Sequence, residues 1–386
     1  MREKTQQLDY LLIISVIGLC IISLLAVYSG SGQYEKSEPF YFVIRQLMWY
    51  GIGFAIMIAV AKFDYELLEK WALAFYIIGL FLLLLVHFFG IERNGAKRWV
   101  YLGLLEIQPS EFMKIFLVLY LAKVLSAAGE KQLSLKHNLK LMIQLVGYTM
   151  IPFLLILVQP DLGSALVIIG VAASLFIVSN VSTKIILLFS GAVASMVGFL
   201  VYLFQYQHEI FTKLLQPHQL SRIYGWINPN QYSSGYGYQL QQALMGIGSG
   251  QLTGNGFNQG IQVQNGKVPE AHTDFIFAVI GEEFGFVGTS ILIFIYFLLI
   301  YRIIQISFRS NHLFGVYICI GITGLIGIQV FQNIGMTIGL TPITGLALPF
   351  VSYGGSALLT NFIALGLVLS VQLRSKNYMF SENIIQ

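Results

Sequence analysis

Ten apolar stretches, each long enough to cross a lipid bilayer, constrain the fold of this chain more than any other feature of its sequence. Hydrophobic residues make up 56% of the 386 residues and charged residues only 10%, an excess that no soluble core of this size requires. We therefore predict an all-α polytopic membrane protein, a single domain over residues 1–386 with about ten transmembrane helices. The predicted spans are residues 10–28, 43–61, 71–89, 112–127, 141–158, 162–179, 185–204, 275–304, 313–334 and 345–373.

The even number of spans places both termini on one side of the membrane, and the distribution of Lys and Arg predicts that this side is the cytoplasm. Arg2 precedes the first span and Arg374 follows the tenth. The first span lacks a cleavage site of small residues, so we expect it to be retained rather than removed as a signal peptide. Cys20 and Cys319 fall in different spans, which argues against a disulfide framework and against a thiolate metal site.

The connection between the seventh and eighth spans, residues 205–273, is far longer than the others. It is rich in Gly, Gln, Asn and Tyr, and its aromatic residues argue against simple disorder. We expect a large, ordered extracytoplasmic loop that caps an outward-facing cavity. Its glycines between residues 246 and 256 resemble a phosphate-binding nest only in composition, and flexible turns explain them better.

Asp274, Glu282 and Glu283 lie at the threshold of the eighth span. Ionisable side chains at membrane depth are costly and usually mark a functional pathway. The apolar run from this point exceeds the thickness of the hydrocarbon core, so its first turns are expected outside the lipid, in the wall of a wet cavity.

Positive charge gathers in the short predicted outer loop after the third span, against the usual bias towards the cytoplasm. The loop contains Arg93, Lys97 and Arg98. Arg45 of the second span and Lys114 of the fourth could add to the same field. One interpretation is an anchor for a polyanionic headgroup, since Arg binds phosphate in a bidentate manner and Lys acts as a point charge. The other is snorkelling towards anionic lipid.

Four further positions are ambiguous. Glu111 and Lys114 are three residues apart on a predicted helix and could pair, either beside an intramembrane path or as a surface ion pair with a helix cap. Asp161 lies in a tight turn, where bonding to its own backbone is favoured over contact with a substrate. Trp99 could contact a substrate or could anchor the chain at the membrane–water interface, where Trp is common.

Two prolines and a glycine pair interrupt the apolar segment 340–356. A broken helix at membrane depth is tolerated only where protein or a cavity satisfies the freed backbone groups. Ser352 and Tyr353 therefore lie either beside the site or at a close helix crossing. The sequence contains no H-E-x-x-H motif and no Ser-His-Asp spacing, so zinc-hydrolase chemistry has no support.

Several short motifs, in their order and spacing, resemble the SEDS family (shape, elongation, division and sporulation) of bacterial cell-wall proteins. The resemblance covers nearly the whole chain, and residues 280–286 are more similar to the elongation branch of the family than to the division branch. Members of this family often have a Lys in the glycine-rich loop that corresponds to residues 248–256, and this chain has Asn255 at that position. The motifs are Asn94-Gly-Ala-Lys-Arg-Trp99, Gln108-Pro-Ser-Glu111, Gln159-Pro-Asp161, His272-Thr-Asp-Phe275, Gly281-Glu-Glu283 and Pro349-Phe-Val-Ser-Tyr-Gly-Gly355.

The resemblance implies a peptidoglycan glycosyltransferase that polymerises lipid II on the outer face of the bacterial cytoplasmic membrane during elongation. It implies a class B penicillin-binding protein as transpeptidase partner, and undecaprenyl pyrophosphate as the carrier of the substrate. Asp274 falls on the family's essential Asp. The other positions expected to bind substrate are Arg45, Lys97, Arg98, Trp99, Glu111, Lys114, Asp161, His272, Thr273, Ser352 and Tyr353.

This chemistry needs a general base for the attacking sugar hydroxyl, and a positioned carboxylate such as Asp274 contributes about 10² to 10⁴-fold in rate. The departing pyrophosphate needs positive charge from Arg98, Lys97, Lys114 or a bound Mg²⁺ or other divalent cation, which Asp274 could help to bind. A single inverting displacement suits one essential carboxylate. We expect no organic cofactor and no nucleic acid partner. The alternatives are a lipid II flippase or other transporter, and a non-catalytic scaffold for the penicillin-binding protein.

Overall fold

A computed structural model describes residues 9–32, 40–93, 96–101, 106–129, 135–179, 181–214, 217–232 and 235–375. In this part of the chain, each of the ten predicted spans overlaps a long helix, which confirms the polytopic helical fold. The helices are α1 (Tyr10–Ser31), α2 (Tyr41–Lys62), α3 (Tyr65–Phe89), α4 (Pro109–Ala128), α5 (Leu135–Val158), α6 (Leu162–Val178), α7 (Thr183–Tyr206), α12 (Ile276–Arg309), α13 (Leu313–Thr337) and α14 (Gly355–Arg374).

Eight of the described helices are long and apolar enough to cross a membrane. The other two are α6, which has 17 residues, and α4, which has 20 residues but carries Glu111, Lys114 and Lys123. Three helices begin at an aspartate whose carboxylate accepts a hydrogen bond from the first turn: Asp9 before α1, Asp64 before α3 and Asp161 before α6. Such caps satisfy amide groups that would otherwise lack partners at the helix ends.

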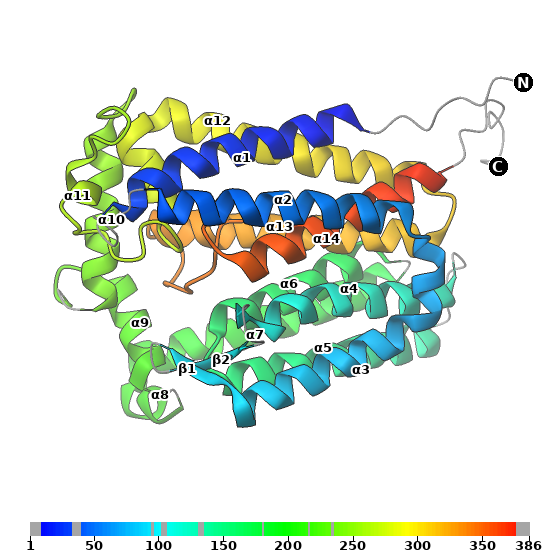
Figure 1. Cartoon of the computed structure of the whole chain (residues 1–386). Helices are drawn as coiled ribbons and strands as arrows, with labels where there is room; N and C mark the ends of the chain where they lie inside the picture. Colours follow the sequence, from blue (N-terminus) through cyan, green and yellow to red (C-terminus); the bar gives the residue numbers. More distant parts are fainter. Residues whose placement is uncertain are drawn as a thin grey trace, which may run out of the picture.

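The long helices run side by side, and α1 begins at the same end of the bundle at which α14 ends (Figure 1). The opposite end carries a small antiparallel sheet in which β2 (Ala96–Tyr101) pairs with β1 (Ile91–Arg93) and β3 (Glu106–Ile107). The same end holds the connection between α7 and α12. As described, this connection contains α8 (His208–Leu214), α9 (Pro217–Ile227), α10 (Tyr236–Gly250) and α11 (Ile261–Gln264).

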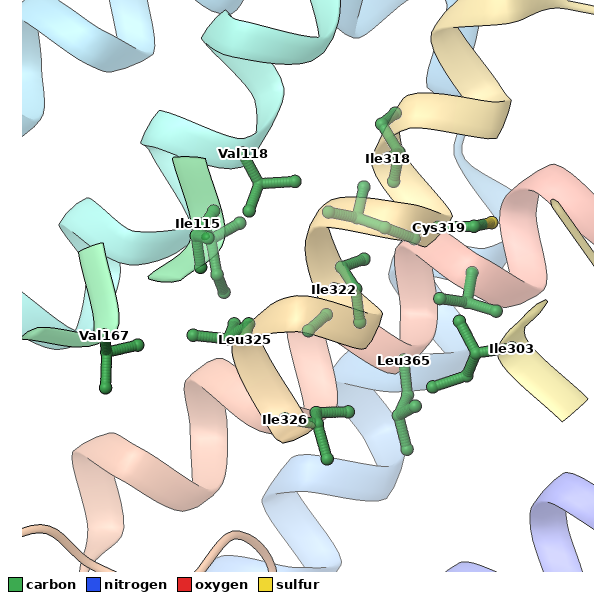
Figure 2. Close-up of a cluster of buried hydrophobic side chains, with 14 of the residues drawn as sticks. Ile115, Val118, Val167, Ile303, Ile318, Cys319, Ile322, Leu325, Ile326 and Leu365 are labelled. Atoms are coloured by element: carbon green, nitrogen blue, oxygen red, sulfur yellow. The ribbon is translucent and has the colours of Figure 1, made fainter. Parts of the chain in front are cut away.

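Helix α13 lies at the centre of the bundle, surrounded by apolar side chains of α4, α6, α12 and α14 (Figure 2). Its Ile318, Ile322 and Ile326 are fully buried. Small residues bring α13 close to α6: a Cβ on Gly324 would lie 2.1 Å from Ser174 Oγ. Without a hydrophobic force between helices in lipid, such close packing contributes much of their association.

The tenth span does not begin where hydropathy predicted, at Gly345. Helix α14 begins at Gly355, and residues 338–354 form an irregular segment. The prediction was wrong because apolar composition does not report backbone conformation. Pro342 and Pro349 lack amide donors, and Gly345 has a φ of 70°, a left-handed value that favours glycine.

Neighbouring helices satisfy the carbonyl groups of this irregular segment, which allows it to lie inside the bundle. Ser23 of α1 donates to the carbonyl of Val351 at 2.7 Å. Gln46 of α2 donates to the carbonyl of Ser352 at 3.2 Å. In the same way, Tyr50 donates to Phe350 O, Tyr296 to Pro349 O and Asn333 to Leu346 O.

Helix α12 bends at Gly285, where φ is 64° and ψ is −159°. The amide groups released by the bend donate to the turn that follows α10, in the middle of the glycine-rich loop: Phe286 N lies 2.9 Å from Gln251 O, and Val287 N lies 3.0 Å from Leu252 O. A Cβ on Gly285 would lie 2.4 Å from Gly254 N. The glycines of this loop therefore allow it to pack directly against the bend.

Candidate functional site

Asp274 lies in the turn just before α12, at the end of the bundle that carries α8–α11. Its side chain is half-buried. Burial raises the pKa of this carboxyl to about 7, and the negative charge of Glu270 adds to the rise. Arg98 and Arg222 act in the opposite direction on the same pKa. A carboxyl with this pKa exchanges a proton readily near neutral pH, as a general base must.

Asn333 of α13 holds the backbone of Asp274 in place. Its side-chain amide donates to Asp274 O at 2.8 Å and to Leu346 O at 2.7 Å. Asn333 is fully buried. Gly345 completes this contact, because a Cβ there would lie 3.2 Å from Asp274 Oδ2. One side chain thus joins the start of α12 to the irregular segment before α14.

Two more hydrogen bonds join the predicted His-Thr-Asp motif to the predicted Ser-Tyr pair. Ser352 Oγ donates to Thr273 O at 2.6 Å, and Tyr353 N donates to His272 O at 2.9 Å. The structure therefore brings together five of the predicted site positions, Asp274 included, although 78 residues separate Asp274 from Ser352 in sequence. Of these two bonds, the one from Ser352 uses its hydroxyl and the one from Tyr353 uses its backbone amide.

The ring of His272 is buried and packs against two aromatic rings that also contact one another. Its centroid lies 4.7 Å from that of Phe42 and 5.7 Å from that of Tyr353. Burial lowers the pKa of His272, so the imidazole is neutral at pH 7. Thr273 points elsewhere, since its hydroxyl donates to Glu270 Oε2 at 2.8 Å.

Arg98 of β2 contacts the turn between α5 and α6. It donates to Gln159 O at 3.2 Å and to Pro160 O. In the same turn, Asp161 accepts from Ser164 N at 3.1 Å and from Gln108 Nε2 at 3.1 Å. The described contacts of Asp161 are thus those of a helix cap, while its charge and that of Arg98 both act on the pKa of Asp274.

Glu111 and Lys114 form the predicted pair, with Lys114 Nζ 2.6 Å from Glu111 Oε1. The pair is buried between α4 and α14, where Thr360 also approaches Glu111 at 3.4 Å. It is therefore not the exposed surface pair that one interpretation expected, because the first turn of α4 packs inside the bundle. Removing one partner of a buried ion pair destabilises a protein much more than removing one partner of an exposed pair, because the remaining charge is left buried without a partner.

The remaining predicted positions lie nearer the surface. Arg45 is exposed on α2, with its guanidinium 4.5 Å from the ring of Tyr41. Lys97 is exposed on β2, and Trp99 is half-buried on the same strand, opposite Ile91. The first two residues of the Asn94–Trp99 motif lie outside the described residues.

Glu282 and Glu283 bind protein groups. The carboxylate of Glu282 accepts from Gln262 N at 2.7 Å and Val263 N at 3.1 Å, at the start of α11. Glu283 accepts from the hydroxyl of Ser29 on α1. Glu282 thus fastens α11 to α12, and Glu283 joins α12 to α1, while Asp274 is the carboxylate of the three that faces the irregular segment before α14.

Sequence reasoning missed Arg222 and Asn333. Arg222 of α9 is 8% exposed, donates to Thr344 O at 3.4 Å and lies 5.1 Å from the ring centroid of Tyr236. The sequence around Arg222 does not indicate that this side chain is buried, because the residue lies in a polar loop. Asn333 did carry a signal, since a polar amide in an apolar span usually has a specific partner.

No group of three or more His, Cys, Asp or Glu side chains converges within the described residues. Mg²⁺ often binds through one or two carboxylates together with substrate phosphates. Asp274 and a pyrophosphate would suit that mode of binding, in which Mg²⁺ supplies charge to the leaving group.

Comparison with known proteins gives a consistent family. Residues 9–377 match the family described as "Cell cycle protein", named for FtsW, RodA and SpoVE. Stage V sporulation protein E of Bacillus subtilis (strain 168) is 35% identical over 382 residues, covering 97% of this chain and 100% of that protein. Peptidoglycan glycosyltransferase MrdB of Escherichia coli (strain K12) is 35% identical over 377 residues, covering 98% of this chain and 96% of that protein.

The fold is also similar to a solved structure. A chain in the structure described as "Structural coordination of polymerization and crosslinking by a peptidoglycan synthase complex" matches with a TM-score of 0.77 and 29% identity, covering 95% of this chain and 97% of that one. The family match spans all of the described helices, and the identities exceed 30% over nearly full length. This chain belongs to the FtsW, RodA and SpoVE family of cell cycle proteins, the SEDS family.

Proposed function

We propose that this protein is a peptidoglycan glycosyltransferase that polymerises lipid II into glycan strands during cell elongation. One observation carries the proposal: a carboxyl with a pKa of about 7, that of Asp274, is held by Asn333 at the mouth of α12. Similarity to MrdB, which is named a peptidoglycan glycosyltransferase, supports the reaction class. The elongation role rests on the motif at residues 280–286, because the sporulation relative is 35% identical as well.

In the proposed reaction, Asp274 takes the proton of the attacking sugar hydroxyl, which then displaces pyrophosphate from the anomeric carbon of the second substrate with inversion. Arg98 and Arg222 supply positive field at Asp274, as their effect on its pKa requires, and the same field stabilises the negative charge that gathers on the leaving group. Lys97 and Arg45, both exposed, are suited to first contact with the headgroup.

The other predicted positions act in this proposal by holding the site. Ser352, Tyr353, Thr273 and His272 connect the two segments that meet at Asp274. Glu111 and Lys114 neutralise one another in the described structure, so Lys114 would reach a pyrophosphate only if the pair separates. Trp99 and Asp161 shape the neighbouring wall through β2 and the start of α6. Binding of a divalent cation is the alternative role for Asp274, and the Asp274→Asn variant at raised Mg²⁺ distinguishes it from proton transfer.

A class B penicillin-binding protein is the proposed partner, as the resemblance to the family implies. The structural match to a chain of a peptidoglycan synthase complex supports an assembly of this kind. Residues 205–273, with α8–α11, form the proposed extracytoplasmic cap over the cavity that receives lipid II.

The protein is a multi-pass membrane protein, and we propose that α8–α11 face the outside of the cytoplasmic membrane while both termini face the cytoplasm. Part of the supporting charge bias comes from Arg2 and Lys376, which lie outside the described residues. In a chain without Cys20 and Cys319, a cysteine at exposed Asn265 should react with an impermeant thiol reagent on intact spheroplasts. A cysteine at exposed Asn311 should react only after lysis; the reverse pattern would contradict the orientation.

The enzymatic proposal is tested by giving purified protein lipid II in detergent and measuring glycan polymer. Polymer formation is expected, and it excludes a pure scaffold. A flippase would instead move labelled lipid II across liposomes without making polymer. Absence of polymer, both alone and with the purified penicillin-binding partner, would overturn the proposal in favour of these alternatives.

A further inference from the structure

A cavity of about 520 Å³ lies between α3, α4 and α5, within the range of volumes that hold small ligands. It is lined by the last turns of α4, the first four turns of α5 and Leu73 of α3. The start of α5 and the end of α4 lie at the end of the bundle where α1 begins, so the cavity is remote from Asp274 (Figure 1).

The polar side of this cavity is basic. Lys123 of α4 and Lys140 of α5 line it together with His137. None of its lining residues is acidic, and neither lysine forms an ion pair with any residue that the structure describes. Two cationic side chains that line one space attract an anion when, as among the described lining residues, no carboxylate faces them, and lysine binds phosphate as a point charge.

Much of the remaining lining of the cavity is apolar or aromatic. Val124 and Leu141 line it, and Tyr120 and Tyr148 close its inner end with ring centroids 4.8 Å apart. Tyr76 stabilises this end, because its hydroxyl donates to Tyr148 O at 2.8 Å. From His137 to Tyr148 the lining extends ~16 Å along the axis of α5. A free phosphate would occupy only the basic mouth, whereas a lipid would use both ends.

The geometry points to a binding site for an anionic phospholipid of the adjacent leaflet, with its phosphate between Lys123 and Lys140 and the start of one acyl chain against the apolar wall. Basic pockets between transmembrane helices at membrane interfaces bind anionic headgroups in this way. Such a lipid would fasten α3 and α5 to α4, whose other end carries the Glu111–Lys114 pair. The site is independent of the proposed glycosyltransferase activity.

The test measures phosphatidylglycerol bound to the purified full-length protein by native mass spectrometry, with phosphatidylcholine as the zwitterionic comparison. The double variant Lys123→Gln/Lys140→Gln should bind phosphatidylglycerol about 30-fold more weakly. The matched control is Lys184→Gln, which removes an exposed lysine at the start of α7, at the same end of the bundle but outside the cavity. It should bind as the unchanged protein does.

A second variant, Ala127→Phe, keeps every charge and fills the cavity, since Ala127 is part of its lining. It should lose phosphatidylglycerol as the double variant does. Unchanged binding by Ala127→Phe would mean that the lysines attract lipid only at the surface, which overturns the site. Displacement of the lipid by an equal concentration of inorganic phosphate would show that the apolar wall contributes nothing, which overturns the lipid as its occupant.

Discussion

The pKa of Asp274 predicts how polymerisation depends on pH. With a pKa of about 7, roughly 9% of the carboxyl is ionised at pH 6 and roughly 91% at pH 8. If the ionised form is the base, the rate of lipid II polymerisation under kcat/KM conditions rises about tenfold over this interval. A carboxyl with the ordinary pKa of 3.8 would be more than about 99% ionised at both values and would give a flat profile.

Glu270→Gln perturbs this pKa selectively. The negative charge of Glu270 raises the pKa of Asp274, so its removal should move the rising limb of the profile to lower pH. The amide of Gln keeps an acceptor for the hydroxyl of Thr273. Glu209→Gln, which removes a carboxylate from exposed α8, is the matched control and should leave the profile in place. A flat profile in the unchanged protein, or a shift to higher pH in Glu270→Gln, would refute the assigned environment of Asp274.

Two further predictions concern the parts that hold the site. Asn333→Ala removes the donor from the buried carbonyl of Leu346, at about 1–3 kcal/mol, and from the part-buried carbonyl of Asp274. Polymerisation and thermal stability should both fall, whereas Thr337→Val on the same helix should lower stability slightly and spare activity. Equal effects of the two variants on activity would contradict the role of Asn333 in holding the backbone of Asp274. Gly285→Ala places a Cβ 2.4 Å from Gly254 N and should lower the unfolding temperature markedly. Gly198→Ala, whose Cβ would have nothing within 4 Å, should raise the unfolding temperature slightly. Similar shifts in the two variants would contradict the close packing of the glycine-rich loop against the bend of α12.

The number and place of the membrane helices could be predicted because the length of an apolar run reports a span directly. The start of the tenth helix could not, because the stretch from Gly345 to Val351 is apolar yet irregular, and its carbonyls depend on side chains from four other helices. Hydropathy contains no information about such distant donors.

The site was predictable only in part for the same reason. Spacing along one helix predicted the pairing of Glu111 with Lys114, which the structure confirms, but not the burial of the pair. Motif resemblance selected Asp274 and Ser352 without indicating that Asn333 joins their segments. Arg222 was missed because its burial depends on how α9 packs, which no local pattern reports.

The measurement that tests the central claim most directly is polymerisation of lipid II by purified Asp274→Asn. Asn keeps the size of Asp and can still hold a sugar hydroxyl, but it cannot take its proton. The account predicts a protein that inserts, unfolds at a normal temperature and binds its penicillin-binding partner, while polymerisation falls by about 10² to 10⁴-fold. Recovery at high Mg²⁺ would assign Asp274 to metal binding instead of proton transfer, and polymerisation at the unchanged rate would contradict a catalytic role for Asp274 altogether.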